Sequence, residues 1–240
     1  MIDFLALTGR SSAHVTQLAG TDHRLQPEAA DAFLALCAAA AEVGIDLAAA
    51  SSWRDFARQR AIWNAKFRLE RPVRNAAGEI IDGHQLEPRA RLEAIMRWSA
   101  IPGASRHHWG TDCDVYDRVA VAVGEAGLQL VPAEYAAGGH QARLHDWLQQ
   151  HMHRFGFYQP YRTDRGGVCP EPWHLSYAPL AMECERALDR DGLLDLLRET
   201  AADASLRIEG HELLCTHLDE WYARFVVAVD APPVDVVLTR

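Results

Sequence analysis

The order of apolar and polar positions along the chain predicts both helices and strands. Apolar residues recur every three or four positions, as on one face of a helix, in four segments: 27–44, 54–67, 88–99 and 141–154. The last of these segments is the most amphipathic, and Gly156 follows it as a predicted C-terminal cap. Pro27 opens the first segment, at a position where a helix accepts proline because the missing N–H has no helical partner.

Shorter stretches have the composition or the alternation of strands. A buried strand that runs into a polar turn is predicted over 44–54, and residues 111–116 alternate as in a strand. Alternation also predicts strands on both sides of a glycine turn within 119–132, whereas 72–83 is expected to be a loop or weak hairpin and 156–177 mostly strand and turn. Helices and strands are mixed without a regular βαβ order. This favours an α+β fold, with an antiparallel sheet and flanking helices.

The character of the chain changes towards its C-terminus. We expect a main domain over residues 1–189 and a small helix–strand extension over 190–240. Within the extension, helical segments alternate with two predicted strands, at 206–210 and 223–229. The extension is too short for a core of its own, so we expect it to pack on the main domain.

The composition limits the partners and the compartment of the protein. The chain has 240 residues, of which 49% are apolar, enough to bury a full core. Its formal net charge of −9 argues against a nucleic-acid partner, because binding to phosphates depends on basic residues. The five cysteines form no C-x-x-C pair, which indicates reduced thiols. We expect no signal peptide, no membrane span and a cytoplasmic location, or a periplasmic one if the N-terminus had been trimmed.

The stretch SRHHWGTDCDVY concentrates titratable side chains. A straight strand would separate His107 from Asp114 by about 23 Å and a helix by about 10 Å, so the chain must reverse between them if they share a ligand. Gly110 supplies the backbone freedom for that reversal. In the strand that follows, Asp112 and Asp114 face one side and Cys113 the other. These residues alone fit either a metal site or a solvated polar turn.

A second cluster, EPWH, contains two more candidate side chains. Glu171 and His174 are three positions apart, so a single tight turn projects both to the same side. Pro172 favours an extended backbone at Glu171, which puts the carboxylate on a short, stiff turn. Together, His107, Asp114 and His174 form the open pattern of a catalytic zinc, in which three protein ligands leave one position for water. Two nitrogens and one oxygen suit zinc better than calcium or magnesium, which prefer oxygen ligands.

Three ordered segments resemble the motifs of the VanY-type D-alanyl-D-alanine carboxypeptidases, zinc peptidases of bacterial cell-wall metabolism. SRHHWGTDCD is similar to the signature S-x-H-x-x-G-x-x-x-D, EPWH to E-x-W-H, and SSWRDFARQ to G-Y-R-S-x-x-x-Q. The resemblance covers roughly residues 45–178 and implies a DD-peptidase or hedgehog-like fold with a zinc site at the sheet. The sequence departs from the family pattern where Asp112 replaces a frequent alanine, and where Trp53 and Asp55 replace the tyrosine and serine beside the arginine.

The resemblance implies which residues hold the metal ion and which one moves protons. His107, Asp114 and His174 would bind one zinc ion per chain, and Glu171 would act as the general base. Because Asp112 shares a strand face with Asp114, the chemistry alone leaves either aspartate as the ligand. The motif favours Asp114, and Asp112 would then hold a histidine N–H or a substrate amine.

The resemblance also implies how the substrate is bound. Arg54, Gln59 and Ser105 would hold its terminal carboxylate, a planar group that a guanidinium matches with two parallel hydrogen bonds. Arg54 would in addition act in catalysis by stabilising the oxyanion. Asp112 and Trp173 are further candidates for contact with the substrate.

The implied activity is a zinc carboxypeptidase that removes a C-terminal D-alanine from peptidoglycan stem peptides or muropeptides. Cleavage of a D,D bond in a pentapeptide and of an L,D bond in a tetrapeptide both fit the sequence. One alternative is an endopeptidase of the phage-lysin type, but such enzymes resemble this domain joined to a basic wall-binding module, and the C-terminal segment here is acidic. Another is a non-catalytic zinc-binding module, against which the presence of Glu171 argues. The sequence does not indicate the oligomeric state.

Overall fold

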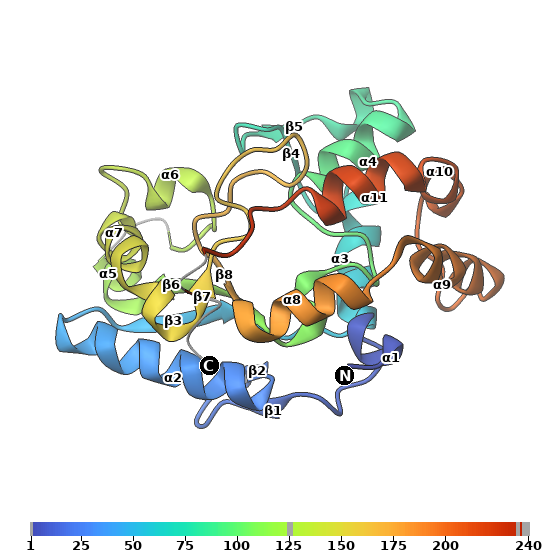
Figure 1. Cartoon of the computed structure of the whole chain (residues 1–240). Helices are drawn as coiled ribbons and strands as arrows, with labels where there is room; N and C mark the ends of the chain where they lie inside the picture. The colour runs from blue at the N-terminus through green and yellow to red at the C-terminus, as the bar shows by residue number, and fades with distance from the viewer. Residues whose placement is uncertain (1, 124–126, 234–235, 237–240) are drawn as a thin grey trace.

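A four-stranded antiparallel sheet lies at the centre of the structure, a computed structural model that describes residues 2–123, 127–233 and 236 (Figure 1). The strands neighbour one another in the order β3 (Leu47–Ser51), β6 (Asp112–Asp117), β8 (His174–Tyr177) and β7 (Phe157–Tyr158). Two small ribbons consist of β1 (Thr16–Gln17) with β2 (Arg24–Leu25) and of β4 (Val73–Arg74) with β5 (Ile80–Ile81). The predicted α+β class with an antiparallel sheet is confirmed.

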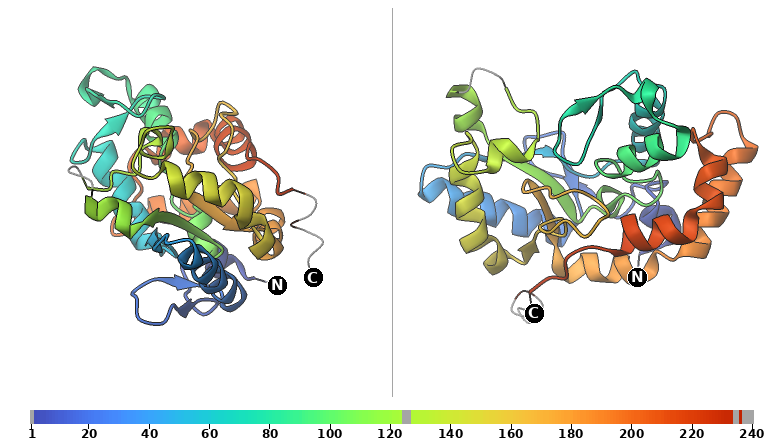
Figure 2. Two further views of the ribbon diagram at one scale, coloured as in Figure 1. Left: turned by 90° about the vertical axis from the view of Figure 1, so that its left-hand side faces the viewer. Right: turned by 90° about the horizontal axis from the view of Figure 1, so that it is seen from above.

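Helices flank the sheet in two groups, which Figure 2 shows at opposite ends of the molecule. The first group consists of α2 (Pro27–Glu42), α5 (Arg118–Val123), α6 (Pro132–Tyr135) and α7 (Ala142–His151). The second consists of α1 (Phe4–Leu7), α3 (Phe56–Phe67), α4 (Pro88–Met96), α8 (Ala178–Ala187), α9 (Arg190–Ala202), α10 (His211–Thr216) and α11 (Leu218–Tyr222). Within the described residues, none of the helices has both the length and the apolar composition that crossing a bilayer requires.

The elements that the sequence predicted most clearly are present. The four predicted helices, over 27–44, 54–67, 88–99 and 141–154, correspond to α2, α3, α4 and α7. The weak hairpin expected in 72–83 is formed by β4 and β5. Gly156 has a φ of +80° and ends the 3₁₀ turn that follows α7, as its predicted capping role requires.

Side chains of the central strands alternate between two environments. Cys113, Val115 and Leu175 are fully buried in one apolar cluster with residues of α2 and α7. All five cysteines are unpaired, which agrees with the predicted reduced thiols. Residues next to the apolar ones in sequence, among them Asp112 and Asp114, point to the other face of the sheet because successive side chains in a strand alternate. One face therefore builds the core, and the other carries the polar groups.

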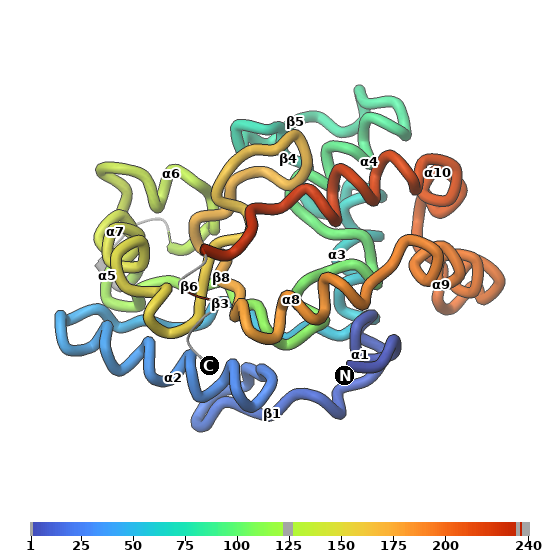
Figure 3. Tube along the Cα trace, viewed as in Figure 1, coloured from blue at the N-terminus to red at the C-terminus, as the bar shows by residue number. Residues whose placement is uncertain are grey.

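A second apolar cluster joins the early helices to the C-terminal ones. Trp63 of α3 and Leu92 of α4 are fully buried together with Leu193 of α9 and Trp221 of α11. Figure 3 shows α11 running beside α4. The extension thus shares its core with the main domain, and the division of the chain at residue 189 stays a prediction.

The two strands predicted in the extension are wrong. Residues 206–210 form turns and irregular backbone, with Ile208 as the one fully buried side chain of the segment. Ala223–Val227 forms a π-helical turn. Trp221 and Phe225 are four positions apart and both face the second apolar cluster, so the period of this segment is that of a helix.

The strands predicted within 119–132 are also wrong where the structure describes them. Arg118–Val123 forms α5, and α6 begins at Pro132. A carboxylate oxygen of Asp117 accepts the backbone N–H of Val119 at 3.0 Å, which favours a helical start over a continued strand. The predicted glycine turn falls partly on residues 124–126, which lie outside the described residues.

The segment after α11 anchors the loop that leads to Glu171 and β8. The carboxylate of the buried Asp230 accepts the backbone N–H of Thr163 and an N–H of Arg165, both at 2.7 Å. The backbone N–H of Asp230 donates in return to the carbonyl oxygen of Pro160 at 2.8 Å. The extension therefore holds this loop in position as well as filling the core.

Gly110 links a 3₁₀ turn to β6 in a conformation that excludes a side chain. Its φ of +68° lies in the left-handed region, and a Cβ would lie 2.4 Å from Cγ1 of Val15 and 3.2 Å from the backbone nitrogen of Gln26. Gln26 also donates its backbone N–H to the Gly110 carbonyl at 2.7 Å, so the backbone has little room to move.

We expect Gly110→Ala to destabilise the fold more than Gly20→Ala does. Both glycines have positive φ angles, of +68° and +74°, and alanine in that region costs about 1–2 kcal/mol. Only Gly110 has close neighbours, because nothing lies within 4 Å of a Cβ at Gly20. Overpacking should add about 1–3 kcal/mol at Gly110. Equal losses in the free energy of unfolding, measured by urea denaturation, would contradict the close packing at Gly110.

Candidate metal centre

Strand pairing and one turn bring the three predicted metal ligands together. β6 pairs with β8 so that Asp114 lies directly opposite His174. His107 comes from the 3₁₀ turn Arg106–Trp109, which precedes β6. One nitrogen of each histidine and one carboxylate oxygen of Asp114 lie within 4.8 Å of one another, and all three side chains are buried. Such a group has the size and the donor atoms of a metal site.

Hydrogen bonds determine which nitrogen of each histidine faces this cluster. Nδ1 of His107 lies 2.9 Å from the carbonyl oxygen of Ser52, an atom that only accepts, so Nδ1 carries the hydrogen. Nε2 of His174 lies 3.0 Å from a carboxylate oxygen of Asp112 and donates to it. The remaining nitrogens, Nε2 of His107 and Nδ1 of His174, lie 3.3 and 3.1 Å from the carboxylate of Asp114. Both lone pairs thus point at the same small volume.

This arrangement calls for a cation between the three side chains. Nδ1 of His174 and Oδ1 of Asp114 are buried and have no hydrogen-bond partner in the described part of the chain when the imidazole is neutral. Burial alone would lower the pKa of His174, but hydrogen bonds with Asp112 and Asp114 outweigh it and raise the pKa well above its usual value. A proton on His174 therefore competes with a metal ion for the same position. The two nitrogens and one oxygen fit zinc.

Asp112 is held behind the cluster by a buried arginine. Nε of Arg106 donates to the Asp112 carboxylate at 2.9 Å, while its Nη atoms bond Glu185 and, at 2.9 Å, the hydroxyl of Tyr158. Burial would raise the pKa of Asp112, but the Arg106 guanidinium and the hydrogen bond from His174 hold it well below its usual range. Asp112 is therefore a charge-balanced anion that orients His174, an arrangement that strengthens many metal sites.

Glu171 lies at the edge of the cluster and faces the pocket. Its Oε2 is 3.5 Å from Nδ1 of His174, and its side chain keeps 13% of its surface exposed. Its carbonyl oxygen accepts the backbone N–H of His174 at 3.0 Å, and its own N–H donates to the carbonyl of Tyr161 at 2.9 Å. The predicted tight turn is present, and the carboxylate stands beside the three ligands without belonging to their group.

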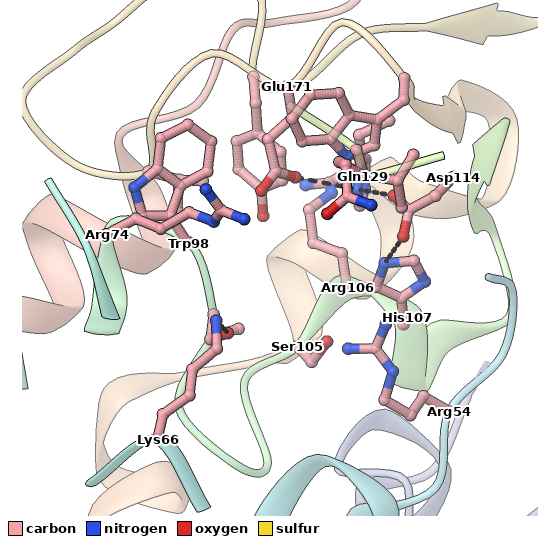
Figure 4. Close-up of a pocket in the computed structure, with 17 residues that line it drawn as sticks. Arg54, Lys66, Arg74, Trp98, Ser105, Arg106, His107, Asp114, Gln129 and Glu171 are labelled. Carbon is pink, nitrogen blue, oxygen red and sulfur yellow. Dashed lines mark hydrogen bonds and ion pairs between the residues drawn. The ribbon is translucent and has the colours of Figure 1, made fainter. Parts of the chain in front are cut away.

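Arg54 enters the same pocket from the end of β3. The pairing of β3 with β6 shifts register between Ala49 and Ser51, a bulge that redirects the chain next to the cluster. The guanidinium donates to the side-chain oxygens of Gln59 at 2.7 Å and Ser51 at 2.8 Å, which fixes its plane. Ser105 also lines the pocket, and Figure 4 shows it on the same side as Arg54.

The contacts of Gln59 fit a role in positioning Arg54. Its side chain is fully buried, its amide oxygen accepts from Arg54, and its amide nitrogen donates to the carbonyl of Ala100 at 2.7 Å. Gln59 does not line the pocket, and its contacts orient Arg54, so direct binding of a substrate carboxylate by Gln59 stays a prediction.

The surroundings of Asp112 do not favour the expected contact with the substrate. Asp112 is fully buried, lies outside the pocket lining, and shares its two oxygens among Arg106, His174, Thr111 and Ser176. Of its two predicted roles, holding a histidine N–H agrees with the geometry and holding a substrate amine does not. Trp173 lines the pocket, although most of its surface is buried.

The pocket, about 220 Å³ in volume, includes residues that the motifs do not identify. Among them are Lys66, Arg74, Trp98 and Tyr161. The sequence contained one signal for the first of these: Lys66 is the only lysine among the 24 lysine and arginine residues of the chain. Arg74 and Trp98 come from separate elements and carry no local pattern that links them to the site.

Comparison with known proteins identifies one family. The sequence model described as VanY, D-alanyl-D-alanine carboxypeptidase, matches residues 22–180. An uncharacterized protein of Haemophilus influenzae is 47% identical over 98 residues, which cover 40% of this chain and 67% of that protein.

Three solved structures have a similar fold. VanYB in complex with D-alanine-D-alanine aligns with a TM-score of 0.52 at 22% identity, covering 78% of this chain and 90% of that one. A single-residue mutant of the D,D-pentapeptidase VanY from a VanB-type resistance cassette, in complex with Zn(II), has a TM-score of 0.50 at 22% identity and covers 76% of this chain and 92% of its own. The LD-carboxypeptidase LdcB has a TM-score of 0.50 at 19% identity, and the alignment covers 90% of this chain and 80% of LdcB. These likenesses establish the fold.

We expect the two neighbouring aspartates to differ in their effect on metal binding. Asp114→Asn removes a ligand charge and should abolish stoichiometric zinc binding. Asp112→Asn keeps the shape of the side chain but weakens the acceptor for His174, so zinc affinity should fall about 10–100-fold. Zinc competition with a chromophoric chelator measures both. If zinc affinity falls more in Asp112→Asn than in Asp114→Asn, Asp112 is the ligand and Asp114 is not.

Proposed function

The chain belongs to the VanY family of D-alanyl-D-alanine carboxypeptidases, and we propose that it is a zinc-dependent enzyme that removes the C-terminal D-alanine from peptidoglycan stem peptides. The observation that carries this proposal is the meeting of three features in one pocket: the open three-ligand cluster, the Glu171 carboxylate and the Arg54 guanidinium. A carboxypeptidase needs all three, because it must activate water, transfer a proton and recognise a free carboxylate.

Proton transfer is the role of Glu171. When bound, zinc supplies a Lewis acid that activates water near neutral pH and polarises a carbonyl group. Glu171 borders the cluster and faces the pocket, so its carboxylate takes a proton from the attacking water and passes it to the leaving amine. The turn between Glu171 and His174 keeps the base and a metal ligand at a constant separation.

Recognition of the substrate's end is the role of Arg54. Two of its five N–H donors bind Gln59 and Ser51, which leaves donors for an incoming carboxylate. Because the guanidinium is held rigidly, little conformational entropy is lost when the substrate binds. Ser105 lines the pocket on the same side and supplies a hydroxyl for the same carboxylate.

Support differs for the alternative activities. The described part of 190–240 packs into the core shared with the rest of the chain, which argues against this segment being the wall-binding module of a phage lysin. The carboxylate of Glu171 beside an open cluster argues against a purely structural zinc module. Removal of D-alanine from a tetrapeptide remains within the proposal, since LdcB, one of the proteins with a similar fold, is an LD-carboxypeptidase.

The proposed activity is tested by incubating the zinc-loaded protein with muramyl pentapeptide and muramyl tetrapeptide and measuring released D-alanine by mass spectrometry. We expect release from at least one of the two peptides. Glu171→Gln should lower kcat by roughly 10²–10⁴-fold because the general base is lost, with zinc still bound in equal amount. No release from either peptide by the wild-type protein would refute the proposed function, and loss of zinc in Glu171→Gln would make Glu171 a ligand.

Arg54→Ala should lower activity mainly towards substrates with a free C-terminal carboxylate. Loss of charge-assisted hydrogen bonds predicts a fall in kcat/KM of roughly 10–100-fold. Arg58→Ala is the matched control, because it removes the same charge from an exposed position in the first turn of α3, close to Arg54 in sequence. If cleavage of a C-terminally amidated peptide falls by the same factor in Arg54→Ala, the proposed recognition of the carboxylate is incorrect.

A further inference from the structure

The cations that line the pocket differ in how their charge is balanced. Arg106 is paired with Asp112 and Glu185, and Arg54 has the substrate's terminal carboxylate as its proposed partner. Lys66 and Arg74 line the pocket too, yet neither has a carboxylate within 4.0 Å among the described residues. Two cationic groups in the pocket are therefore left without an anionic partner.

Lys66 extends from the last turn of α3 into the pocket. Its ammonium group donates to the side-chain oxygen of Ser99 at 2.6 Å. Burial lowers the pKa of Lys66 to about 8, against the opposing attraction of Glu171. Keeping a desolvated ammonium group without a counterion costs stability, and such groups are concentrated at functional sites. The single lysine of the chain therefore lies where burial of its charge is unfavourable for folding, so a role in binding a ligand is a reason for it to be there.

Arg74 enters from β4, on a wall of the pocket that is fixed by tryptophans. Its Nη1 donates to the carbonyl of Gly78 at 2.6 Å, which leaves other N–H donors of the guanidinium unused by that bond. Trp98 donates its indole N–H to the carbonyl of Asn75 at 2.9 Å and stacks with Trp173 at 6.5 Å between ring centroids. In Figure 4, Arg74 and Lys66 enter from the side opposite His107 and Asp114.

We propose that Lys66 and Arg74 form a second anion subsite, which binds a side-chain carboxylate carried by one of the last three residues of the peptide substrate. Three residues span at most about 10 Å, a length compatible with one small pocket. Arg54 then binds the terminal carboxylate and the second subsite binds the acidic side chain, so the enzyme selects peptides that carry two carboxylates near the C-terminus. The ligand of the second subsite depends on the proposed function, because the substrate is taken to be a peptide with a free C-terminus.

Calorimetry with matched peptides tests this selectivity without turnover. The ligands are N-acetylated tripeptides that end in a D-residue. Each of the three positions is tested in turn with a pair of peptides, one with Glu and one with the neutral Gln at that position, and both peptides of a pair have the same chirality. Binding is measured to the zinc-loaded Glu171→Gln protein. At one position, the Glu peptide should bind roughly 10–100-fold tighter than the Gln peptide, as charge-assisted hydrogen bonds predict.

Substitutions in the same background assign the effect to the two residues. Lys66→Met should reduce the Glu/Gln preference to near unity, Arg74→Met should reduce it in part, and Lys66→Arg should retain it. Arg71→Met is the matched control, since Arg71 is exposed and is absent from the pocket lining of the described residues. Absence of any Glu preference in the parent protein, or an unchanged preference in Lys66→Met, would overturn the second subsite.

The unique lysine allows a direct spectroscopic test. Reductive methylation with ¹³C-formaldehyde labels only Lys66 and the α-amino group, and Lys66→Arg identifies the lysine signal. Addition of the preferred Glu peptide should shift this signal and raise the pKa of Lys66, whereas the Gln peptide should leave that pKa unchanged. An equal response to both peptides would contradict the subsite. Selective binding without peptide hydrolysis by the wild-type protein would refute the proposed function alone.

Discussion

The antiparallel register between β6 and β8 is the constraint on which the whole site depends. It sets Asp114 directly opposite His174, on the sheet face that carries the polar groups. The apolar face keeps that register, because Cys113, Val115 and Leu175 are fully buried against α2 and α7. A slip of one residue would turn the carboxylates into the apolar core and the apolar side chains into the pocket, at a large cost in free energy. Hydrophobic burial on one face thus positions the proposed metal ligands on the other.

The charges around the sheet divide according to how they are balanced. Behind the histidines, Arg106 lies between Asp112 and Glu185 in a network whose charges are paired within the protein. In the pocket, Arg54 and Lys66 have only neutral side-chain partners among the described residues. Paired charges orient other side chains, whereas unpaired ones in a pocket are available to a ligand. This difference separates the groups that build the site from those we propose to bind the substrate.

Short-range patterns predict the central strands and the main helices, whereas the choice of Asp114 over Asp112 as a ligand needs the resemblance to the family's motifs. The reversal at Gly110 and the alternation after it depend on neighbouring residues. The sequence therefore predicts both the turn and the strand face on which Asp112 and Asp114 lie. It does not predict the second anion subsite, because Lys66 of α3 and Arg74 of β4 are distant in element order and line the same pocket only in the folded chain. The alternating valines within 118–123 indicate a strand, although a capping carboxylate next to them starts a helix. Whether such a short segment forms a strand or a helix depends on long-range packing and on capping side chains, and the period of its apolar residues is not enough to predict it.

We propose that two histidines and one aspartate hold a single metal ion and leave a coordination position open. Anomalous diffraction at the zinc edge, from crystals of the zinc-loaded protein, tests it most directly. We expect one strong peak per chain, at about 2.0–2.2 Å from Nε2 of His107, Nδ1 of His174 and a carboxylate oxygen of Asp114, with no fourth protein ligand. A peak bonded to Asp112 in place of Asp114, a fourth side chain closing the site, or no peak at this cluster would contradict it.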